Sequence, residues 1–407
     1  MKDISNIPIY VIDTLTTLEN SNFKAYLVGG CTRDSLLGIT PSDWDITTDA
    51  LPEDIIRIFP HTIPTGIKHG TITVICPDKQ SIEITTFRAD GEYKDSRHPE
   101  EVYFSKDITD DLSRRDFTMN AIAWSLHEGL VDPFDGITDI TNQIIRTVGA
   151  AKKRFSEDAL RMMRAIRFSS ILNFSLDSEI PAAISDLSDL LKNISIERIR
   201  DEFEKTLLSP QPQKILFFLN LGLSKYFFPE LSKIAQIKSE ATISILSDSC
   251  QCFPSRFAYL LSSCCLDSSP IMKRLKFDNK TSALTQSILR CLNEDFPVTP
   301  YLMRKALSNK MLSSGLYLSL KIRRDTSSSS EAKIKIDSAL AIYNDILVGN
   351  HCTNLATLAV NGNDLDALGI KDGKEKGNML NKLLDNVLLD PSLNTYDILI
   401  KIAKEIC

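Results

Sequence analysis

Two aspartates separated by one residue, Asp43 and Asp45 in the segment DWDIT, are the clearest candidates for chemistry in this sequence. On a strand, their side chains would point to the same face, about 7 Å apart along the chain. Two carboxylates this close repel each other unless a cation lies between them. A hard divalent cation such as Mg²⁺ prefers oxygen ligands and also binds phosphate oxygens. The pair alone could equally be a solvated strand edge.

A glycine pair precedes these aspartates. Gly29 and Gly30 follow the apolar run KAYLV and open the segment CTRDSLLG, a pattern that predicts a strand, a tight turn and a short helix closed by Gly38. Glycines at such a turn let backbone N–H groups approach an anion, and Arg33 adds a fixed cation one turn into the helix. By itself this is an ordinary turn. Together with the aspartates, it predicts a site for a nucleoside triphosphate and two metal ions.

The predicted secondary structure changes along the chain, from strands and helices in the first part to helices alone in the rest. DWDIT (43–47) reads as a strand, and TITVIC (71–76) and SIEITTF (81–87) flank a polar turn and predict an antiparallel hairpin. Residues 1–148 therefore predict a small mixed sheet with helices. The charged segment 88–104 predicts a long mobile loop. From Ser156 onward the periodicity is helical, with Ser195 as an expected N-cap and the serines at 327–330 as the best linker candidate.

Composition narrows the class of protein. The 407 residues are 43% hydrophobic and 25% charged, which is typical of a globular chain of more than one domain. No stretch is long and apolar enough to span a membrane, and the N-terminus lacks a signal-peptide pattern, so we expect a cytoplasmic protein. Nine cysteines without metal-ligand spacing predict reduced thiols. The net charge of −6 does not exclude a local cluster of basic residues. The segment from Arg146 to Arg167, called the basic track below, contains seven Lys or Arg and only two acidic residues.

The glycine pair and the aspartates, LVGGCTRDSLLG…DWDITT, resemble the signature of the nucleotidyltransferase superfamily that includes DNA polymerase beta. More closely, they resemble class II tRNA nucleotidyltransferases (CCA-adding enzymes) and bacterial poly(A) polymerases. Cys31-Thr32 and Ala150-Ala151 depart from the usual family residues, but neither change removes a charged group. Further segments match in order: TGIKHGTITV (65–74), ITTFRADGEYKDSRHPEEVYF (84–104), DLSRRDFTMNAIAW (111–124), VDPFDGITDI (131–140), RFSEDALRMMRAIRF (154–168) and SIERIRDEFEKTL (195–207).

The resemblance implies an α+β fold: a polymerase-beta-like head, with a mixed five-stranded sheet and helices, followed by an all-α C-terminal half. The expected domains are a catalytic head (1–148), a helical neck that recognises the base (149–208), an RNA-binding helical body (209–325) and a tRNA-binding helical tail (326–407). It also implies two Mg²⁺ on Asp43 and Asp45, which activate the RNA 3′-hydroxyl and stabilise the pyrophosphate that leaves.

Asp158 and Arg161 are the expected base-reading pair. Ser156 predicts an N-cap, which would place the two residues at i and i+3 on one helix face. An aspartate beside an arginine offers an acceptor next to donors, which matches the amino group and ring nitrogen of cytosine and adenine but not of guanine or uracil. Wrong bases would leave buried partners unpaired, at about 1–3 kcal/mol each. The alternative is that the acidic residues Glu157 and Asp158 only stabilise the N-terminus of the helix by interacting with its dipole. Matching residues read the base in the resembled family.

Other positions take their roles from the resemblance alone. Arg115 matches a nucleotide-contacting arginine, and Asp116 a group that binds ribose or positions an arginine. Arg164 and Arg167 match nucleotide contacts, although they could bind RNA phosphates or solvent instead. Glu83 matches a third carboxylate, with a solvated strand face as the alternative.

The resemblance predicts the addition of CCA to the 3′ end of tRNA from CTP and ATP. The expected partners are these nucleotides and the tRNA acceptor arm. A poly(A) polymerase, a partial enzyme that adds only CC or only A, and an inactive RNA-binding protein on the same scaffold are the alternatives.

Overall fold

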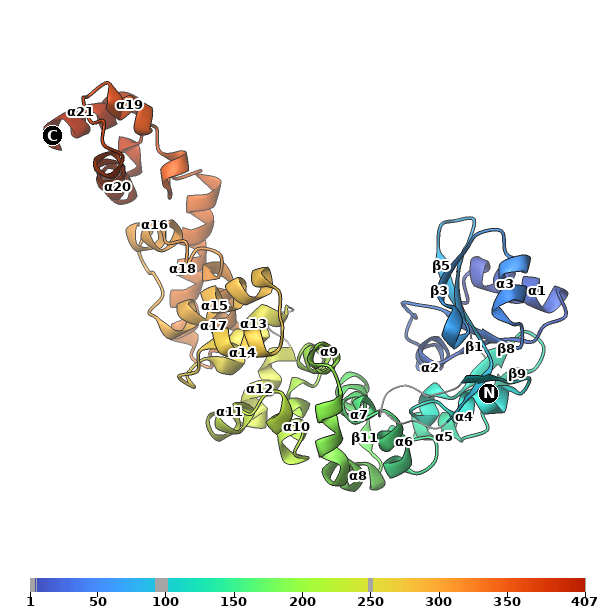
Figure 1. Ribbon diagram of the computed structural model, residues 1–407. Helices are drawn as coiled ribbons and strands as arrows, with labels where there is room; N and C mark the ends of the chain where they lie inside the picture. The colour runs from blue at the N-terminus through green and yellow to red at the C-terminus, as the bar shows by residue number, and fades with distance from the viewer. Residues whose placement is uncertain (1–3, 5, 92–101, 248–251, 407) are drawn as a thin grey trace. The chain divides into compact units, whose positions relative to one another are not determined.

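The chain forms two compact units, Met1–Pro229 and Glu230–Cys407, in a computed structural model that describes residues 4, 6–91, 102–247 and 252–406 (Figure 1). The first unit contains a mixed sheet and then helices, and the second is helical. Two of the predicted domain boundaries, after residues 148 and 208, fall inside the first unit, and the one after residue 325 falls inside the second. These boundaries stay predictions. Among the described residues, no helix has the length and apolarity needed to cross a bilayer.

The sheet of the first unit has the strand order β3-β4-β5-β2-β1-β8-β9. Strand β2 is parallel to β5 and antiparallel to β1, so the sheet is mixed, as the sequence predicts. It has seven strands rather than the predicted five. The strands are β1 (Ala25–Val28), β2 (Asp45–Thr48), β3 (Thr62–Gly66), β4 (Thr71–Ile75), β5 (Ser81–Thr86), β8 (Ala123–Ser125) and β9 (Gly129–Val131).

Both faces of the central strand β1 are covered. Leu27 packs in a core with the helices α1 (Ile9–Asn20) and α3 (Pro52–Ile58), which lie on one side of the sheet (Figure 1). Tyr26 and Val28 point the other way, into a second core with α4 (Ile108–Ser113). A strand buried on two faces reads as a continuous apolar run, which is why KAYLV shows no alternation.

The strands β4 and β5 form the predicted hairpin, and Lys79 in its turn has a φ of 69°. The prediction of a loop over 88–104 is wrong at both ends. There, β6 (Arg88–Asp90) pairs antiparallel with β7 (Val102–Phe104). The sequence did not predict these strands because three residues are too few to show an alternating pattern, and because the segment is polar and charged. Residues 92–101 of this segment lie outside the described residues.

Helices fill the rest of the first unit, together with a small parallel ladder of β10 (Ile144–Ile145) and β11 (Ser175–Leu176). Ser195 is the N-cap of α9, as predicted, although its side chain makes no capping hydrogen bond. Helix α7 packs against α9. The remaining helices are α2 (Gly30–Leu36), α5 (Gly136–Thr141), α6 (Ala151–Glu157), α7 (Leu160–Leu172), α8 (Glu179–Leu187), α9 (Ile196–Leu207) and α10 (Leu216–Asn220).

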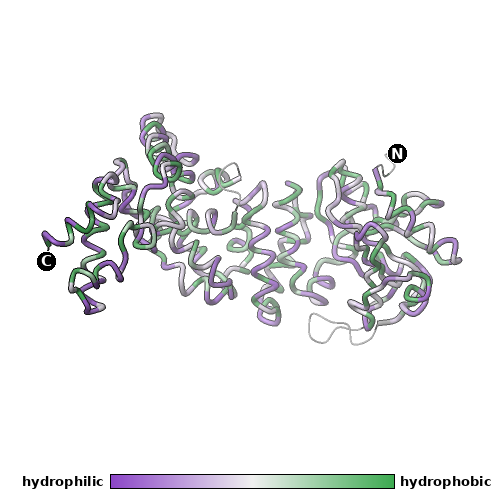
Figure 2. The backbone as a smooth tube through the Cα atoms, turned by 90° about the horizontal axis from the view of Figure 1, so that it is seen from above, coloured by the Kyte–Doolittle hydropathy of each residue, from purple (hydrophilic) through white to green (hydrophobic). Residues whose placement is uncertain are grey.

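The second unit is built from amphipathic helices, along which hydrophobic and hydrophilic residues alternate (Figure 2). Its buried residues include a cluster around Leu320 and another around Leu383. Ser329 caps the helix that follows the predicted serine linker. The helices are α11 (Leu231–Ile237), α12 (Glu240–Ser244), α13 (Phe253–Leu261), α14 (Ser268–Arg274), α15 (Asn279–Asn293), α16 (Pro300–Ser308), α17 (Leu316–Thr326), α18 (Ser330–Val348), α19 (Gly362–Asp366), α20 (Gly373–Leu389) and α21 (Tyr396–Ile406).

Candidate active site

The glycine turn places the end of β1 against a guanidinium group. Gly29 has a φ of 81°, a left-handed conformation that favours glycine, and α2 begins at Gly30. A Cβ on Gly29 would lie 3.1 Å from Nη1 of Arg115. Glycine at this position therefore gives the turn its shape and also lets Arg115 come close to the backbone.

The two aspartates lie at the start of β2: Asp45 is its first residue, and Asp43 lies two residues before it. Asp43 precedes the strand and is exposed, so the prediction that both residues belong to one strand is wrong. Asp45 lies opposite Glu83 in the parallel ladder. Burial, together with the charges of Glu83 and Asp43, raises the pKa of Asp45 to about 6, although Arg115 acts in the opposite direction. A carboxylate crowded in this way by others favours a bound cation.

Arg115 is held by an aspartate that the sequence analysis did not single out. Asp111 has a fully buried side chain and accepts hydrogen bonds from Arg114 Nη2 at 2.6 Å and Arg115 Nη2 at 2.9 Å. Burial would raise the pKa of Asp111, but the charges of Arg115 and Arg114 hold it below its usual value. Its spacing of three and four residues from the two arginines, within DLSRRD, was a usable signal.

A second buried carboxylate holds Arg164. Asp116 lies 2.6 Å from Arg164 Nη2 and accepts a hydrogen bond from the Asn120 amide at 3.0 Å. Asn120 in turn accepts from Arg33 Nη1 at 2.8 Å. Burial would raise the pKa of Asp116, but the charge of Arg164 and the hydrogen bonds from Asn120 and Arg164 lower it to about 2. The chain Arg33–Asn120–Asp116–Arg164 thus links α2 to α7.

The predicted base-reading pair is not on one uninterrupted helix. Ser156 lies inside α6, which ends at Glu157, and the next helix, α7, begins at Leu160. The predicted N-cap at Ser156 is therefore wrong. Asp158 is the C-cap of α6, and Ala159 is the N-cap of α7. The Asp158 side chain accepts a hydrogen bond from the Leu160 N–H at 3.0 Å, a local side-chain contact that competes with helical backbone bonding. No glycine or proline signals the break between the two helices.

Asp158 and Arg161 each have another partner. Asp158 Oδ2 is 3.1 Å from Arg198 Nη2, whereas Arg161 Nη1 is 2.6 Å from Glu157 Oε2. Arg161 also donates to the carbonyl of Arg114 at 3.1 Å, which ties the helix to the segment that carries Arg115. That these two side chains read a base stays a prediction. Arg198 is a further residue that the sequence analysis missed, because the pairing spans 40 residues.

Most of the predicted site residues meet in one cavity of about 320 Å³. Glu83, Asp158 and Arg161 do not line it. Asn120 and Phe168 do, and neither was predicted from the sequence. The predicted residues in its wall are Gly29, Gly30, Arg33, Asp43, Asp45, Arg115, Asp116, Arg164 and Arg167.

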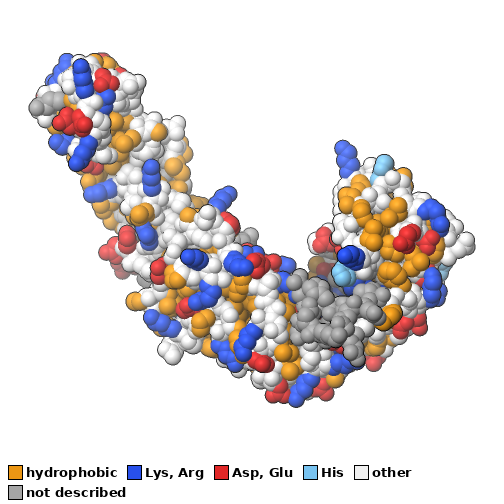
Figure 3. All heavy atoms as spheres, viewed as in Figure 1, with side chains coloured by type: hydrophobic (Ala, Val, Ile, Leu, Met, Phe, Trp, Pro, Cys, Tyr) orange, Lys and Arg blue, Asp and Glu red, His pale blue; other side chains and the backbone are white. Residues whose placement is uncertain are grey.

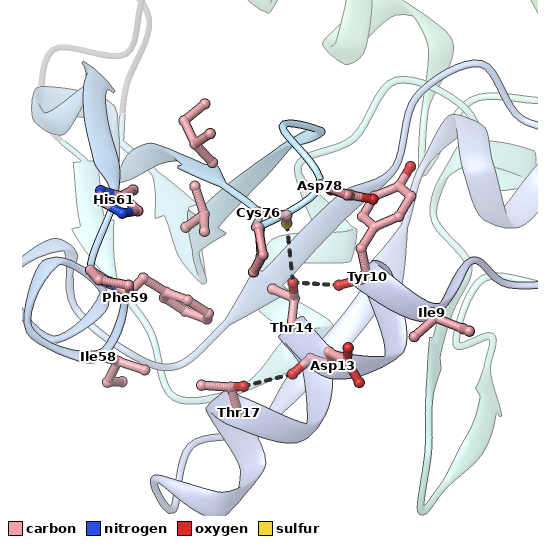
Figure 4. A pocket seen from close by; sticks show the side chains of 14 residues that line it. Ile9, Tyr10, Asp13, Thr14, Thr17, Ile58, Phe59, His61, Cys76 and Asp78 are labelled. Carbon is pink, nitrogen blue, oxygen red and sulfur yellow. Dashed lines mark hydrogen bonds between the residues drawn. The ribbon is translucent and has the colours of Figure 1, made fainter.

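A larger cavity of about 550 Å³ lies elsewhere in the first unit, between α1, the end of α3 and the β4–β5 turn (Figure 4). Its wall is mainly apolar and contains none of the predicted site residues. Tyr10, Thr14 and Cys76 line it, and Thr14 Oγ1 lies 3.8 Å from Cys76 Sγ. The smaller cavity is the better candidate because only there do a carboxylate pair, a glycine turn and several guanidiniums come together.

The predicted basic track is a network of ion pairs rather than a row of free cations. Carboxylates such as Glu157 and Glu202 lie next to its cations. Six of its members lie within 4 Å of a carboxylate oxygen: Arg146, Lys152, Arg154, Arg161, Arg164 and Arg167.

Cysteine and histidine do not add a metal site to the part of the chain that the structure describes. The seven cysteines in that part are free, and no group of three or more His, Cys, Asp or Glu side chains could hold a metal ion there. Glu83 as a catalytic residue stays a prediction.

Comparison with known proteins gives the family. A CCA-adding enzyme of Lactobacillus helveticus is 35% identical over 411 residues, which cover 99% of this chain and 98% of that protein. The chain belongs to the CCA-adding enzyme family. A second CCA-adding enzyme, from Lactobacillus johnsonii, is 49% identical over 226 residues, which cover 54% of this chain and 56% of that one.

Family models and solved structures agree with this assignment. The poly A polymerase head domain matches residues 25–146, and a model described as a probable RNA- and SrmB-binding site of polymerase A matches residues 173–234. The crystal structure of a Bacillus stearothermophilus CCA-adding enzyme in complex with CTP has a TM-score of 0.81 and 30% identity, with 98% of each chain covered. The predicted fold class, an α+β head followed by helices, is confirmed by this likeness.

Proposed function

We propose that this chain adds CCA to the 3′ end of tRNA, using CTP and ATP and releasing pyrophosphate. The observation that carries the proposal is the 320 Å³ cavity in which the Asp43/Asp45 pair, the glycine turn and three arginines of α2 and α7 meet. Family membership supports the reaction, and the relative of known structure that is 30% identical was solved with CTP. We infer a cytoplasmic location from the composition and from tRNA as the substrate.

The carboxylates fit a divalent metal. Asp43 and Asp45 would hold Mg²⁺, because their crowding raises the pKa of Asp45 and no arginine forms an ion pair with either among the described residues. Bound Mg²⁺ supplies two things at such a site: a more acidic 3′-hydroxyl and neutralisation of the phosphate charge. Two such ions would complete the predicted mechanism.

The side chains of the cavity would orient the nucleotide for in-line attack on its α-phosphate. Arg33, Arg164 and Arg167 would bind the negatively charged triphosphate, and Arg115 would lie against the glycine turn beside it. Asp158 and Arg161 would select the base. To do so, each would exchange its present partner, Arg198 or Glu157, for a hydrogen bond to cytosine or adenine.

Two further activities fit the same chemistry. A poly(A) polymerase or an enzyme that adds only CC or only A would use the same carboxylates and arginines. The segment 88–104, which would help to change the pocket between cytidine and adenosine addition, favours the complete activity, although most of it lies outside the described residues.

One assay separates these possibilities. A tRNA transcript that lacks its terminal CCA is incubated with CTP, ATP or both, and the products are separated at nucleotide resolution. We expect three added residues with both nucleotides. Two added residues or one would indicate a partial enzyme, and a long adenosine ladder would indicate a poly(A) polymerase.

A further inference from the structure

Phe168, on α7, lies beside three guanidinium groups of the cavity. The Cζ atoms of Arg167, Arg33 and Arg164 lie over its ring, at 4.1, 5.0 and 5.3 Å from the ring centroid. The ring is 6% exposed and lines the same cavity as the arginines. A cation over the face of an aromatic ring is attracted by the ring quadrupole, and the attraction grows when the pair is shielded from water.

Each arginine also has a polar partner away from the ring. Arg33 lies 2.7 Å from Asp34, and Arg164 lies 2.6 Å from Asp116. Arg167 Nε and Glu202 Oε2 lie 2.6 Å apart. Arg167 is also the arginine whose Cζ atom lies closest to the ring centroid.

Three like charges around one point repel one another, and most strongly where water is excluded. The carboxylates that contact the three guanidiniums are separate groups: Asp34 on α2, Asp116, and Glu202 on α9. The Cζ atoms of all three arginines lie over the ring of Phe168. The ring of Phe117 packs edge-on against it, at 5.7 Å between centroids, a favourable geometry for two aromatic rings.

Other buried phenylalanines of the same unit have a different environment. Phe218 is fully buried and packs edge-on against Phe227 at 5.6 Å, in a cluster of aromatic rings. Phe218 therefore serves as a control, since it has the same side chain and is also buried but does not line the cavity. A core role predicts the same behaviour for Phe168 and Phe218, whereas a role in orienting cations predicts different behaviour.

We propose that Phe168 is a positioning residue: its ring gathers Arg33, Arg164 and Arg167 so that they converge on the triphosphate of the incoming nucleotide. This inference rests on the proposed function, because it assumes that the cavity binds CTP and ATP. It assigns no direct contact with the nucleotide to Phe168.

The test replaces Phe168 with mono-, di- and trifluorinated phenylalanine in the full chain. Fluorine weakens the ring quadrupole step by step while the size and apolarity of the ring change little. We expect the Kd for CTP and for ATP, measured by calorimetry without tRNA, to rise with each fluorine, by about 2- to 30-fold at the trifluorinated ring. The melting temperature should stay near that of the wild type.

Leucine substitutions complete the comparison. Phe168→Leu should weaken nucleotide binding at least as much as the trifluorinated ring, and Phe218→Leu should lower the melting temperature without changing the Kd. A constant Kd across the fluorine series would overturn the positioning role while leaving the proposed function intact. A wild-type chain that binds neither CTP nor ATP would overturn both.

Discussion

The two units of this chain use charge in different ways. In the first unit, several ion pairs involve buried carboxylates: the side chain of Asp111, which pairs with nearby arginines, is 0% exposed. The side chains of Glu202 and Asp116, which pair with arginines far away in the sequence, are 7% and 9% exposed. In the second unit, charges are interspersed over the visible surface of the helices (Figure 3). There, Asp337 and Glu331 are 49% and 80% exposed within their ion pairs.

This difference explains which unit reveals its function. A buried ion pair requires particular residues at particular positions, because removing one partner leaves an uncompensated charge. Exposed pairs contribute little and tolerate exchange. The motifs that predicted a nucleotidyltransferase all lie in the first unit, whereas the helices of the second are specified mainly by their apolar faces.

The largest effect should come from the metal ligands. Asp43→Ala should lower the rate of nucleotide incorporation by about 10³-fold or more, because the carboxylate contributes several kcal/mol of charge stabilisation through its metal. Single-turnover incorporation of labelled CMP into tRNA would measure it. Asp186→Ala, which breaks an exposed ion pair with Lys152 in the same unit, is the control and should have wild-type activity. Incorporation by Asp43→Ala at the wild-type rate would refute the metal assignment.

Next in size is the loss of a buried carboxylate. Asp116→Asn leaves Arg164 without its ionic partner, so the free energy of unfolding at pH 7 should fall by about 3–5 kcal/mol. Urea unfolding of the wild type and the variant would measure this difference.

The pH dependence of that difference sharpens the test. The pKa of Asp116 is about 2 in the folded protein against 3.8 as its ordinary value, so the ionised group stabilises the fold above pH 3.8. The lowered pKa corresponds to about 2 kcal/mol, about half of which should be lost at pH 3 as the group becomes protonated. A stability difference that is the same at pH 7 and pH 3 would show that Asp116 is not held as a carboxylate.

Base selection should change more moderately. Arg161→Ala removes the donor that would face the ring nitrogen of cytosine or adenine, so discrimination against UTP and GTP should fall by about 10- to 100-fold. Competition between CTP and UTP in kcat/KM would measure it. Arg57→Ala, a change of an exposed arginine that is 73% accessible, is the control. If Arg161→Ala rejects UTP and GTP as well as the wild type does, the base-reading role is wrong.

The smallest effects should come from the second unit, with one instructive exception. Glu331→Ala breaks an exposed pair with Lys335 and should leave the melting temperature unchanged. Arg304 is 5% exposed and donates to the carbonyls of Leu388 and Leu389 at the end of α20. Arg304→Met should therefore cost about 1–3 kcal/mol by calorimetry. Equal melting temperatures for the two variants would remove the distinction between buried and exposed charge in this unit.

Local patterns predicted local structure well. The apolar run before Gly29 forms the buried strand β1, and the predicted hairpin forms β4 and β5. The residues of the glycine turn and the Asp43/Asp45 pair line one cavity. The break between α6 and α7 was not predictable from periodicity, because the apolar positions continue through it and only the side chain of Asp158 marks it.

The ion pairs between different helices could not be predicted from the sequence. The contacts of Arg198 with Asp158 and of Arg167 with Glu202 join different helices, and nothing in the spacing of these residues identifies the partner. The contact of Phe168 with three arginines depends in the same way on how α2 and α7 pack. Many of the residues that line the cavity could therefore be predicted from the sequence, but not the network of contacts between them.

A crystal structure of this chain with CTP and Mn²⁺ would locate both the nucleotide and the metal. We expect anomalous scattering from Mn²⁺ at Asp43 and Asp45, the triphosphate among Arg33, Arg164 and Arg167, and the cytosine edge facing Asp158 and Arg161. CTP bound in the apolar cavity beside α1, or no Mn²⁺ at the two aspartates, would contradict the proposed site.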